Sequence, residues 1–169
     1  MRIRPMPNYN MRMPPTDTAT AAVKKDIICS VKMIVADDTY QIRHRVLWPN
    51  RPISEIKIPE DINARHFGAY VDGKLVGVVS LFREGETLQF RKLAVLAEYR
   101  GHGIGQKLIN SCIIEARNHQ VKSLWCDARS SAIEFYKKLG FSVETDVFIK
   151  NGKEYQKAYF DTSKVQSKL

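Results

Sequence analysis

The stretch RKLAVLAEYRGHGIGQKLI, residues 91–109, constrains the fold more than any other part of the chain. An apolar, strand-like run is followed by three glycines at alternate positions, Gly101, Gly103 and Gly105, and then by a sequence with helical periodicity. Because glycine has no Cβ, such a turn lets backbone N–H groups point at one ligand, and the helix N-terminus behind it adds positive potential. The stretch therefore predicts a strand, a turn that binds a phosphate or pyrophosphate, and a helix.

Two familiar phosphate-binding motifs do not match this turn. A P-loop ends in Gly-Lys-Ser/Thr, whereas Gly105 is followed by Gln106 and Lys107. The dinucleotide fingerprint needs an early βαβ unit with an acidic residue about 20 positions on, and here the preceding strand belongs to a predicted meander. A simple glycine-rich helix cap is the alternative, but a cap needs one glycine rather than three. Arg100, directly before the turn, favours the anion site.

Hydrophobic periodicity places this motif in an α/β fold. Alternating apolar residues and turn residues predict a meander, and three-to-four spacing predicts helices between further strands. The predicted strands cover 27–35, 66–71, 74–84, 86–96, 122–128, 141–150 and 153–160, and the predicted helices cover 36–48, 103–120 and 130–140, with a loop at 50–63. This order predicts a mixed, mostly antiparallel sheet of six to seven strands flanked by helices.

Length and charge define the organisation of the chain. With 169 residues, one domain over 26–169 is expected. Residues 1–25 lack periodicity and predict a flexible arm. The net charge of +9 favours anionic partners, yet the arm alone carries five basic residues and one acidic residue, hence +4, and leaves +5 for the rest. No nucleic-acid motif accompanies this charge, so no nucleic-acid partner is predicted.

The remaining composition predicts a soluble, cytoplasmic protein. The sequence has no run of 18 apolar residues and no secretory signal, which predicts no membrane partner. Cys29, Cys112 and Cys126 have no paired spacing and predict reduced thiols, and the four scattered histidines predict no metal site.

Two motifs resemble the GCN5-related N-acetyltransferase (GNAT) family. RGHGIG, residues 100–105, matches the family pattern Arg/Gln-x-x-Gly-x-Gly/Ala, and AIEFYKKLGF, residues 132–141, resembles its Ala-x-x-x-Tyr-x-x-x-Gly-Phe segment. Their order and separation fit one helix plus one strand, and the element order extends the resemblance to about residues 27–161. One position departs from the pattern: Arg129 stands where many members carry Asn.

The resemblance implies acetyl-CoA as the acetyl donor and no metal. It places the pantetheine arm along Leu93, Ala94 and Val95. The pyrophosphate would rest on the backbone of Arg100, Gly101, His102, Gly103, Ile104 and Gly105. Arg129 would meet a phosphate. A primary amine would attack the thioester directly, and Tyr136 would donate a proton to the leaving thiolate. The alternative for Tyr136 is a core aromatic, although its neighbour Phe135 is the better core candidate.

The base that deprotonates the amine is less clear from the sequence. The predicted strand 86–96 offers Gln89 and Arg91 where many relatives carry glutamate, and neither can act as a base. Asp127 is the preferred candidate, because it interrupts an apolar strand that ends beside the expected cleft, with Glu86 and His66 as further candidates. A helix N-cap or an ion pair with Arg129 is the alternative role for Asp127.

The acceptor is predicted from the first helix and the loop after it, which wall the acceptor site in the family. Arg43, Arg45 and Trp48, with His44 and Arg51 nearby, suit a small acceptor that carries a phosphate or carboxylate. An amino-sugar phosphate such as glucosamine 6-phosphate is the concrete hypothesis, and solvated helix residues are the alternative reading of this cluster. A protein or peptide acceptor and a non-catalytic acetyl-CoA-binding module remain open, as does a homodimer.

Overall fold

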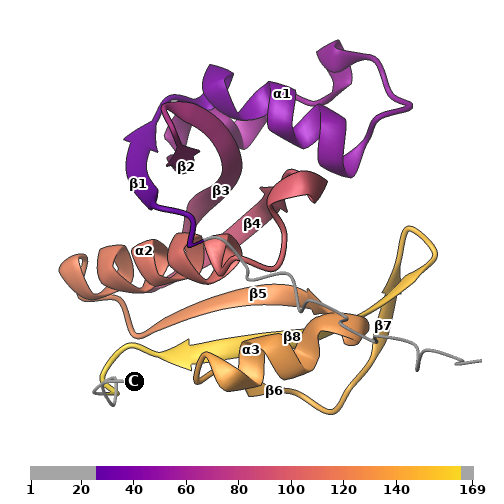
Figure 1. The fold of residues 1–169 in the computed structure, drawn as a ribbon. Coiled ribbons are helices and arrows are strands. Elements are labelled where there is room, and N and C mark those ends of the chain that lie inside the picture. The colour runs from indigo at the N-terminus through magenta and orange to yellow at the C-terminus, as the bar shows by residue number, and fades with distance from the viewer. Residues whose placement is uncertain (1–25, 165–169) are drawn as a thin grey trace, which may run out of the picture.

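The computed structural model describes residues 26–164, so the arm predicted for residues 1–25 lies outside the described part. One mixed sheet runs through the domain in the order β1-β2-β3-β4-β5-β8-β6, with β7 paired to β8 (Figure 1). Its strands are β1 Cys29–Ile34, β2 Arg65–Val71, β3 Lys74–Glu84, β4 Thr87–Val95, β5 Ser123–Arg129, β6 Ser142–Val143, β7 Phe148–Lys150 and β8 Lys153–Asp161. All neighbouring strands are antiparallel except β4 and β5, which are parallel. The predicted fold class is confirmed.

Two long helices cover opposite faces of the meander. These are α1, Ala36–Leu47, and α2, Ile104–Asn118; a shorter α3, Ile133–Lys138, packs near β5, β6 and β8 (Figure 1). On β3, Gly77 faces α2, because a Cβ there would meet Leu108 at 3.1 Å and Ile104 at 3.3 Å. Ser80 lies three residues on, points to the other face and bonds to Arg43 of α1. Among residues 26–164, no helix is long and apolar enough to cross a membrane.

The core forms where α2 lies on the sheet. Its apolar residues recur at three-to-four spacing, and six of them are buried: Ile104, Leu108, Ile109, Cys112, Ile113 and Ala116. Because Gly77 has no side chain, the first turn of α2 can approach β3 closely. The N-terminus of α2 is thereby fixed beside the end of β4.

The segment predicted as one strand, 141–150, is two strands. β6 pairs with the later half of β8, where Ser142 opposes Tyr159, and β7 pairs with its first half, where Phe148 opposes Tyr155. Residues 144–147 leave the ladder between them, although the Glu144 N–H still donates to the Lys157 carbonyl at 2.8 Å. The prediction of a continuous strand was therefore wrong at its centre.

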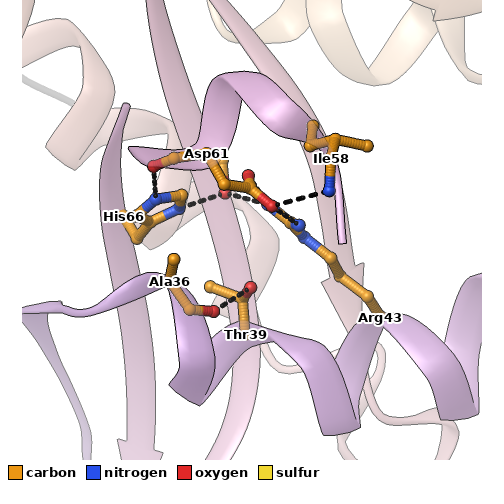
Figure 2. Close-up of polar contacts among 7 residues, drawn as sticks. Ala36, Thr39, Arg43, Ile58, Asp61 and His66 are labelled. Atoms are coloured by element: carbon orange, nitrogen blue, oxygen red, sulfur yellow. Dashed lines mark hydrogen bonds and ion pairs between the residues drawn. The ribbon is translucent and has the colours of Figure 1, made fainter. Parts of the chain in front are cut away.

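The loop 50–63 contains two 3₁₀ helices, Ile53–Glu55 and Pro59–Asn63, and a buried polar cluster anchors it (Figure 2). Arg43 donates to both carboxylate oxygens of Asp61, at 2.7 and 2.8 Å, and also to Ser80 Oγ at 2.8 Å. His66 bonds through Nδ1 to Ser80 Oγ at 2.7 Å and through Nε2 to the Asp61 carbonyl at 2.9 Å. The cluster ties α1, the loop, β2 and β3 together.

Both ring nitrogens of His66 take part in hydrogen bonds. A carbonyl only accepts, so Nε2 carries a proton and donates to the Asp61 carbonyl. Arg43 only donates, so the Ser80 oxygen accepts from it, and the same oxygen is the partner of His66 Nδ1. His66 is thereby held inside the buried cluster.

Candidate active site

A cleft opens between β4 and β5 because these strands pair over only part of their length. Their ladder covers Thr87–Ser123, Leu88–Leu124 and Gln89–Trp125 and then stops, although β4 continues to Val95 and β5 to Arg129. The strands separate beyond Gln89 and leave a cavity of about 430 Å³. The lining residues include Phe90, Arg91, Lys92 and Leu93 from β4, and Cys126, Asp127 and Arg129 from β5.

A β-bulge lies in β4 where it lines the cleft. Ser80 opposes Arg91 and Val78 opposes Ala94, so Lys92 and Leu93 together face the single residue Val79. Lys92 has a φ of 59°, which is uncommon for a residue with a side chain. Such a bulge interrupts the ladder and leaves local backbone groups unpaired at this point of β4.

Tyr136 lies in the cleft lining and in the core at once. It is 8 % exposed and packs against Phe90, Phe135 and Phe141 with ring centroids 5.2 to 6.0 Å away. Burial, together with the neighbouring Cys126, raises the pKa of Tyr136, so the phenol keeps its proton at neutral pH. Phe135, the predicted core residue of this pair, is 38 % exposed instead. The six-residue α3 turns Tyr136 inward and Phe135 outward.

Asp127 supplies the carboxylate of the cleft. It lies on β5 opposite Lys157 of β8, and its Oδ2 is 3.7 Å from Lys150 Nζ. Its Oδ1 is buried and has no hydrogen-bond partner within residues 26–164. Such a group is costly to leave unsatisfied, so an incoming hydrogen-bond donor is the expected partner. Cys126, next to it, has a pKa raised by burial, so its thiol is protonated and a poor nucleophile.

The glycine turn adopts the expected geometry at the N-terminus of α2. Gly101 and Gly103 have φ values of 78° and 75°, the left-handed region that favours glycine. Gly103 is the N-cap of α2, no side chain caps it, and the first turn contains no acidic residue. The first N–H groups of a helix have no intrahelical acceptor, so this end suits an anion. Arg100 is exposed, and its Nε donates to the Val95 carbonyl at 3.2 Å.

Leu93, Ala94, Val95 and Arg129 were also expected to contact the donor, and only some of them line the cleft. Leu93 lines the cleft, Ala94 is buried opposite Val78, and Val95 opposes Gly77. Arg129 lines the cleft with its guanidinium 5.7 Å from the Tyr155 ring centroid.

The cationic cluster expected to bind the acceptor divides into separate places. Trp48 lines the cleft, as does Arg51, whose guanidinium lies 5.7 Å from the Trp48 ring centroid. Arg45 is outside the cleft lining and forms an exposed ion pair with Glu98 at 2.8 Å. Arg43 has no exposed surface and is held by Asp61. The structure thus corrects the expected position of Arg43: it belongs to the buried cluster of Figure 2, not to an acceptor pocket.

The other two candidates for the base lie away from the cleft. His66 is 3 % exposed within the buried cluster, and Glu86 lies in the β3–β4 turn as the ion-pair partner of Lys122. Sequence reasoning missed three cleft cations, Lys92, Lys150 and Lys153. The predicted hairpin turn at Asn151 and Gly152 could have indicated that Lys150 and Lys153 lie close together, since both flank that turn. No local sequence pattern indicated that Lys92 lies in the cleft.

Comparison with known proteins agrees with this geometry. A family model described as the acetyltransferase (GNAT) family matches residues 35–141. Over 120 residues the chain is 34 % identical to YitI of Bacillus subtilis, described as an uncharacterized N-acetyltransferase, and the match covers 66 % of this chain and 80 % of YitI.

Solved structures share the fold at low sequence identity. An IAA acetyltransferase from Bacillus cereus matches with a TM-score of 0.65 and 18 % identity, covering 79 % of this chain and 99 % of that one. A GNAT family acetyltransferase from Elizabethkingia anophelis with acetyl-CoA bound matches with a TM-score of 0.62 and 16 % identity, covering 79 % and 97 %. Both matches establish the common fold.

Proposed function

Because the chain belongs to the GNAT family of acetyltransferases, whose members use acetyl-CoA, we propose that it acetylates the primary amine of a small anionic acceptor. An amino-sugar phosphate such as glucosamine 6-phosphate is the concrete candidate. The donor would enter between β4 and β5, and the acceptor would enter from the side of Trp48 and Arg51.

The charge of the cleft carries the proposal. Among residues 26–164, its lining contains one carboxylate, Asp127, and six cationic side chains: Arg51, Arg91, Lys92, Arg129, Lys150 and Lys153. A cleft with this balance attracts an acceptor that has one amine and at least one anionic group, and it repels a polyamine. Arg51 is well placed for the anionic group, because it is exposed beside Trp48.

Donor binding would rest on backbone groups and one cationic side chain. The N–H groups of the first turn of α2 and the exposed Arg100 would hold the pyrophosphate. These features fit acetyl-CoA, which would supply the activated acetyl group.

The chemistry assigns one step to each of two side chains. Asp127 would accept a proton from the acceptor ammonium, directly or through a water, because only the neutral amine can attack the thioester. Tyr136 would donate a proton to the thiolate that leaves, since its raised pKa keeps the phenol protonated. The amine nitrogen bonds to the acetyl carbon as the carbon–sulfur bond breaks, and the second proton that the nitrogen loses replaces the one that Tyr136 gives to the thiolate.

Release of free thiol from acetyl-CoA, measured over matched amines, tests the proposal. The panel pairs glucosamine 6-phosphate with glucosamine and adds a polyamine, amino acids and a peptide with a free N-terminus. We expect kcat/KM to be at least about 10-fold higher for the phosphorylated sugar, as a charged hydrogen bond is worth about 1.5–3 kcal/mol. Equal kcat/KM for the two sugars would refute the hypothesis of an anionic acceptor. A higher kcat/KM for the peptide would favour a peptide acceptor instead.

A pair of arginine variants isolates the acceptor contact. Arg51→Met should lower kcat/KM for the phosphorylated sugar and leave that for glucosamine unchanged. Arg45→Met is the matched control, because Arg45 is exposed in the same region but lies outside the cleft lining. Equal effects of the two variants would show that the general positive field, rather than Arg51, attracts the acceptor.

A further inference from the structure

Lys92 is the least exposed of the three lysines that line the cleft within residues 26–164. The β4 bulge holds its backbone at a φ of 59°, and its Nζ lies 4.4 Å from the Trp48 ring centroid inside the cleft lining. Lys150 and Lys153 line the same cleft, but both are exposed. Lys92 is therefore an amine held beside the segment of β4 where the donor is proposed to bind.

The surroundings of Lys92 lower its pKa and make the neutral amine more frequent. Burial, followed by the positive charges of Lys150 on β7, Arg43 on α1 and Arg91 on β4, lowers the pKa to about 8, and Asp61 opposes this with the smallest contribution. The Trp48 ring, 4.4 Å from Nζ, attracts the ammonium form by a cation–π contact and so acts in the opposite direction. At pH 7 a lysine with this pKa is neutral about 300 times more often than an ordinary lysine. The neutral amine is the form that attacks a thioester.

We propose that Lys92 is a self-acetylation site, at which the enzyme modifies its own chain when acetyl-CoA is bound and no acceptor fills the cleft. The proposal rests on the proposed binding of the donor between β4 and β5. Neutral Nζ attacks the acetyl carbonyl carbon, a carbon–nitrogen bond forms and the carbon–sulfur bond breaks. The coenzyme leaves as its thiol with the proton that Nζ loses, so no further reactant is needed.

Acetylation of Lys92 would change the cleft in two ways. The amide carries no charge, so one of the six cations that attract an anionic acceptor is lost. The added acetyl group also occupies space beside Trp48, where the acceptor would enter. Self-acetylation would therefore reduce turnover when acceptor is scarce, and bound acceptor would protect Lys92.

Incubation of the full chain with acetyl-CoA alone, followed by intact-mass and peptide mass spectrometry, tests this inference. We expect one acetyl group per chain, located at Lys92, and a matching single release of thiol. The rate should rise with pH and level off above about 8, where Lys92 is neutral. Excess free CoA should suppress the reaction, because it competes for the donor site.

Two variants make the result specific. The Lys92→Arg variant should not become acetylated. It should still bind CoA, as measured by calorimetry, which excludes unfolding as the cause. Lys150→Arg, in the same cleft, should still be modified at Lys92. Modification spread over exposed lysines, or insensitive to CoA, would overturn the inference. If the enzyme acetylates an added amine but Lys92 is never modified, self-acetylation is refuted and the proposed function stands. If the protein does not bind CoA, both self-acetylation and the proposed function are refuted.

Discussion

Arg43 provides the sharpest test of the structure, because its sequence position suggested acceptor binding and its contacts indicate a structural role. Arg43 is fully buried and donates to Asp61 and Ser80, while Arg45, two residues on, is 60 % exposed and pairs with Glu98. We therefore compare Arg43→Met with Arg45→Met. Methionine keeps an unbranched chain of helix-compatible shape and removes the charge.

The expected losses of unfolding free energy differ several-fold between Arg43→Met and Arg45→Met. Removal of one partner of a buried ion pair costs about 3–5 kcal/mol, because the other charge stays buried without compensation. For Arg43→Met the lower end applies, since Asp61 retains the Ile58 N–H and can take up a proton. Loss of the exposed Arg45–Glu98 pair should cost about 1 kcal/mol or less. Arg43→Met should thus lower the melting temperature by on the order of 10 °C.

Urea denaturation at neutral pH measures both free energies, and acid pH adds an independent check. Burial raises the pKa of Asp61, but hydrogen bonds from Arg43 and from the Ile58 N–H outweigh it, so the pKa lies below the usual value of 3.8. A lowered folded-state pKa gives stability that is complete above the unfolded value and is lost as pH falls through the folded value. The gap between wild type and Arg43→Met should therefore narrow below about pH 4.

The outcome that would refute this reasoning is equally specific. A cost below about 1 kcal/mol for Arg43→Met, equal to that of Arg45→Met, would mean that the ion pair does not stabilise the fold. A double variant, Arg43→Met with Asp61→Leu, completes the cycle and should cost clearly less than the sum of the single changes. If Arg43→Met instead kept its stability and raised KM for the acceptor alone, the acceptor role would be restored.

Three further predictions concern the cleft and the glycine turn. Tyr136→Phe should lower kcat in the thiol assay about 100-fold with little change in KM, and an unchanged kcat would exclude Tyr136 as the proton donor. Gly103→Ala should cost about 1 kcal/mol of unfolding free energy and raise KM for acetyl-CoA, whereas Gly73→Ala, at the same φ of 75° in the β2–β3 turn, should cost the same and leave KM unchanged. Lys92→Met should raise the unfolding free energy at pH 7 by about 1–2 kcal/mol, after allowance for solvent exposure. Because the pKa of Lys92 in the folded state is lowered to about 8, the wild-type protein gains stability above that pH. The stability advantage of the variant over wild type should therefore shrink by pH 10.

The turn and the helix behind it could be predicted because their signals are local. Gly101 and Gly103 occupy positive-φ positions, and the three-to-four spacing of the buried residues identifies the inward face of α2. The meander was equally accessible, since Asp72-Gly73 and the residues around Gly85 mark its turns. Each of these features depends on neighbours within a few positions.

Features that depend on distant partners were not accessible in the same way. Arg43 lies one turn after Thr39 and next to Ile42, so its place on the buried face of α1 could have been found from helical spacing, but Asp61 could not. The lowered pKa of Lys92 depends on burial and on charges from two other elements, Lys150 on β7 and Arg43 on α1. The preference for Phe135 over Tyr136 as the core residue was wrong because a six-residue helix has too few turns to define a face.

The short ladder between β4 and β5 joins the two halves of the sheet at one end only (Figure 1). Three residue pairs form this ladder, and the Trp125 indole, which donates to Thr87 Oγ1 at 3.2 Å, reinforces that closed end. A molecule lodged in the open end touches both halves and replaces part of the missing ladder. Amide hydrogens on both sides of the cleft should then exchange more slowly as one group, so ligand occupancy would set how cooperatively the whole sheet unfolds.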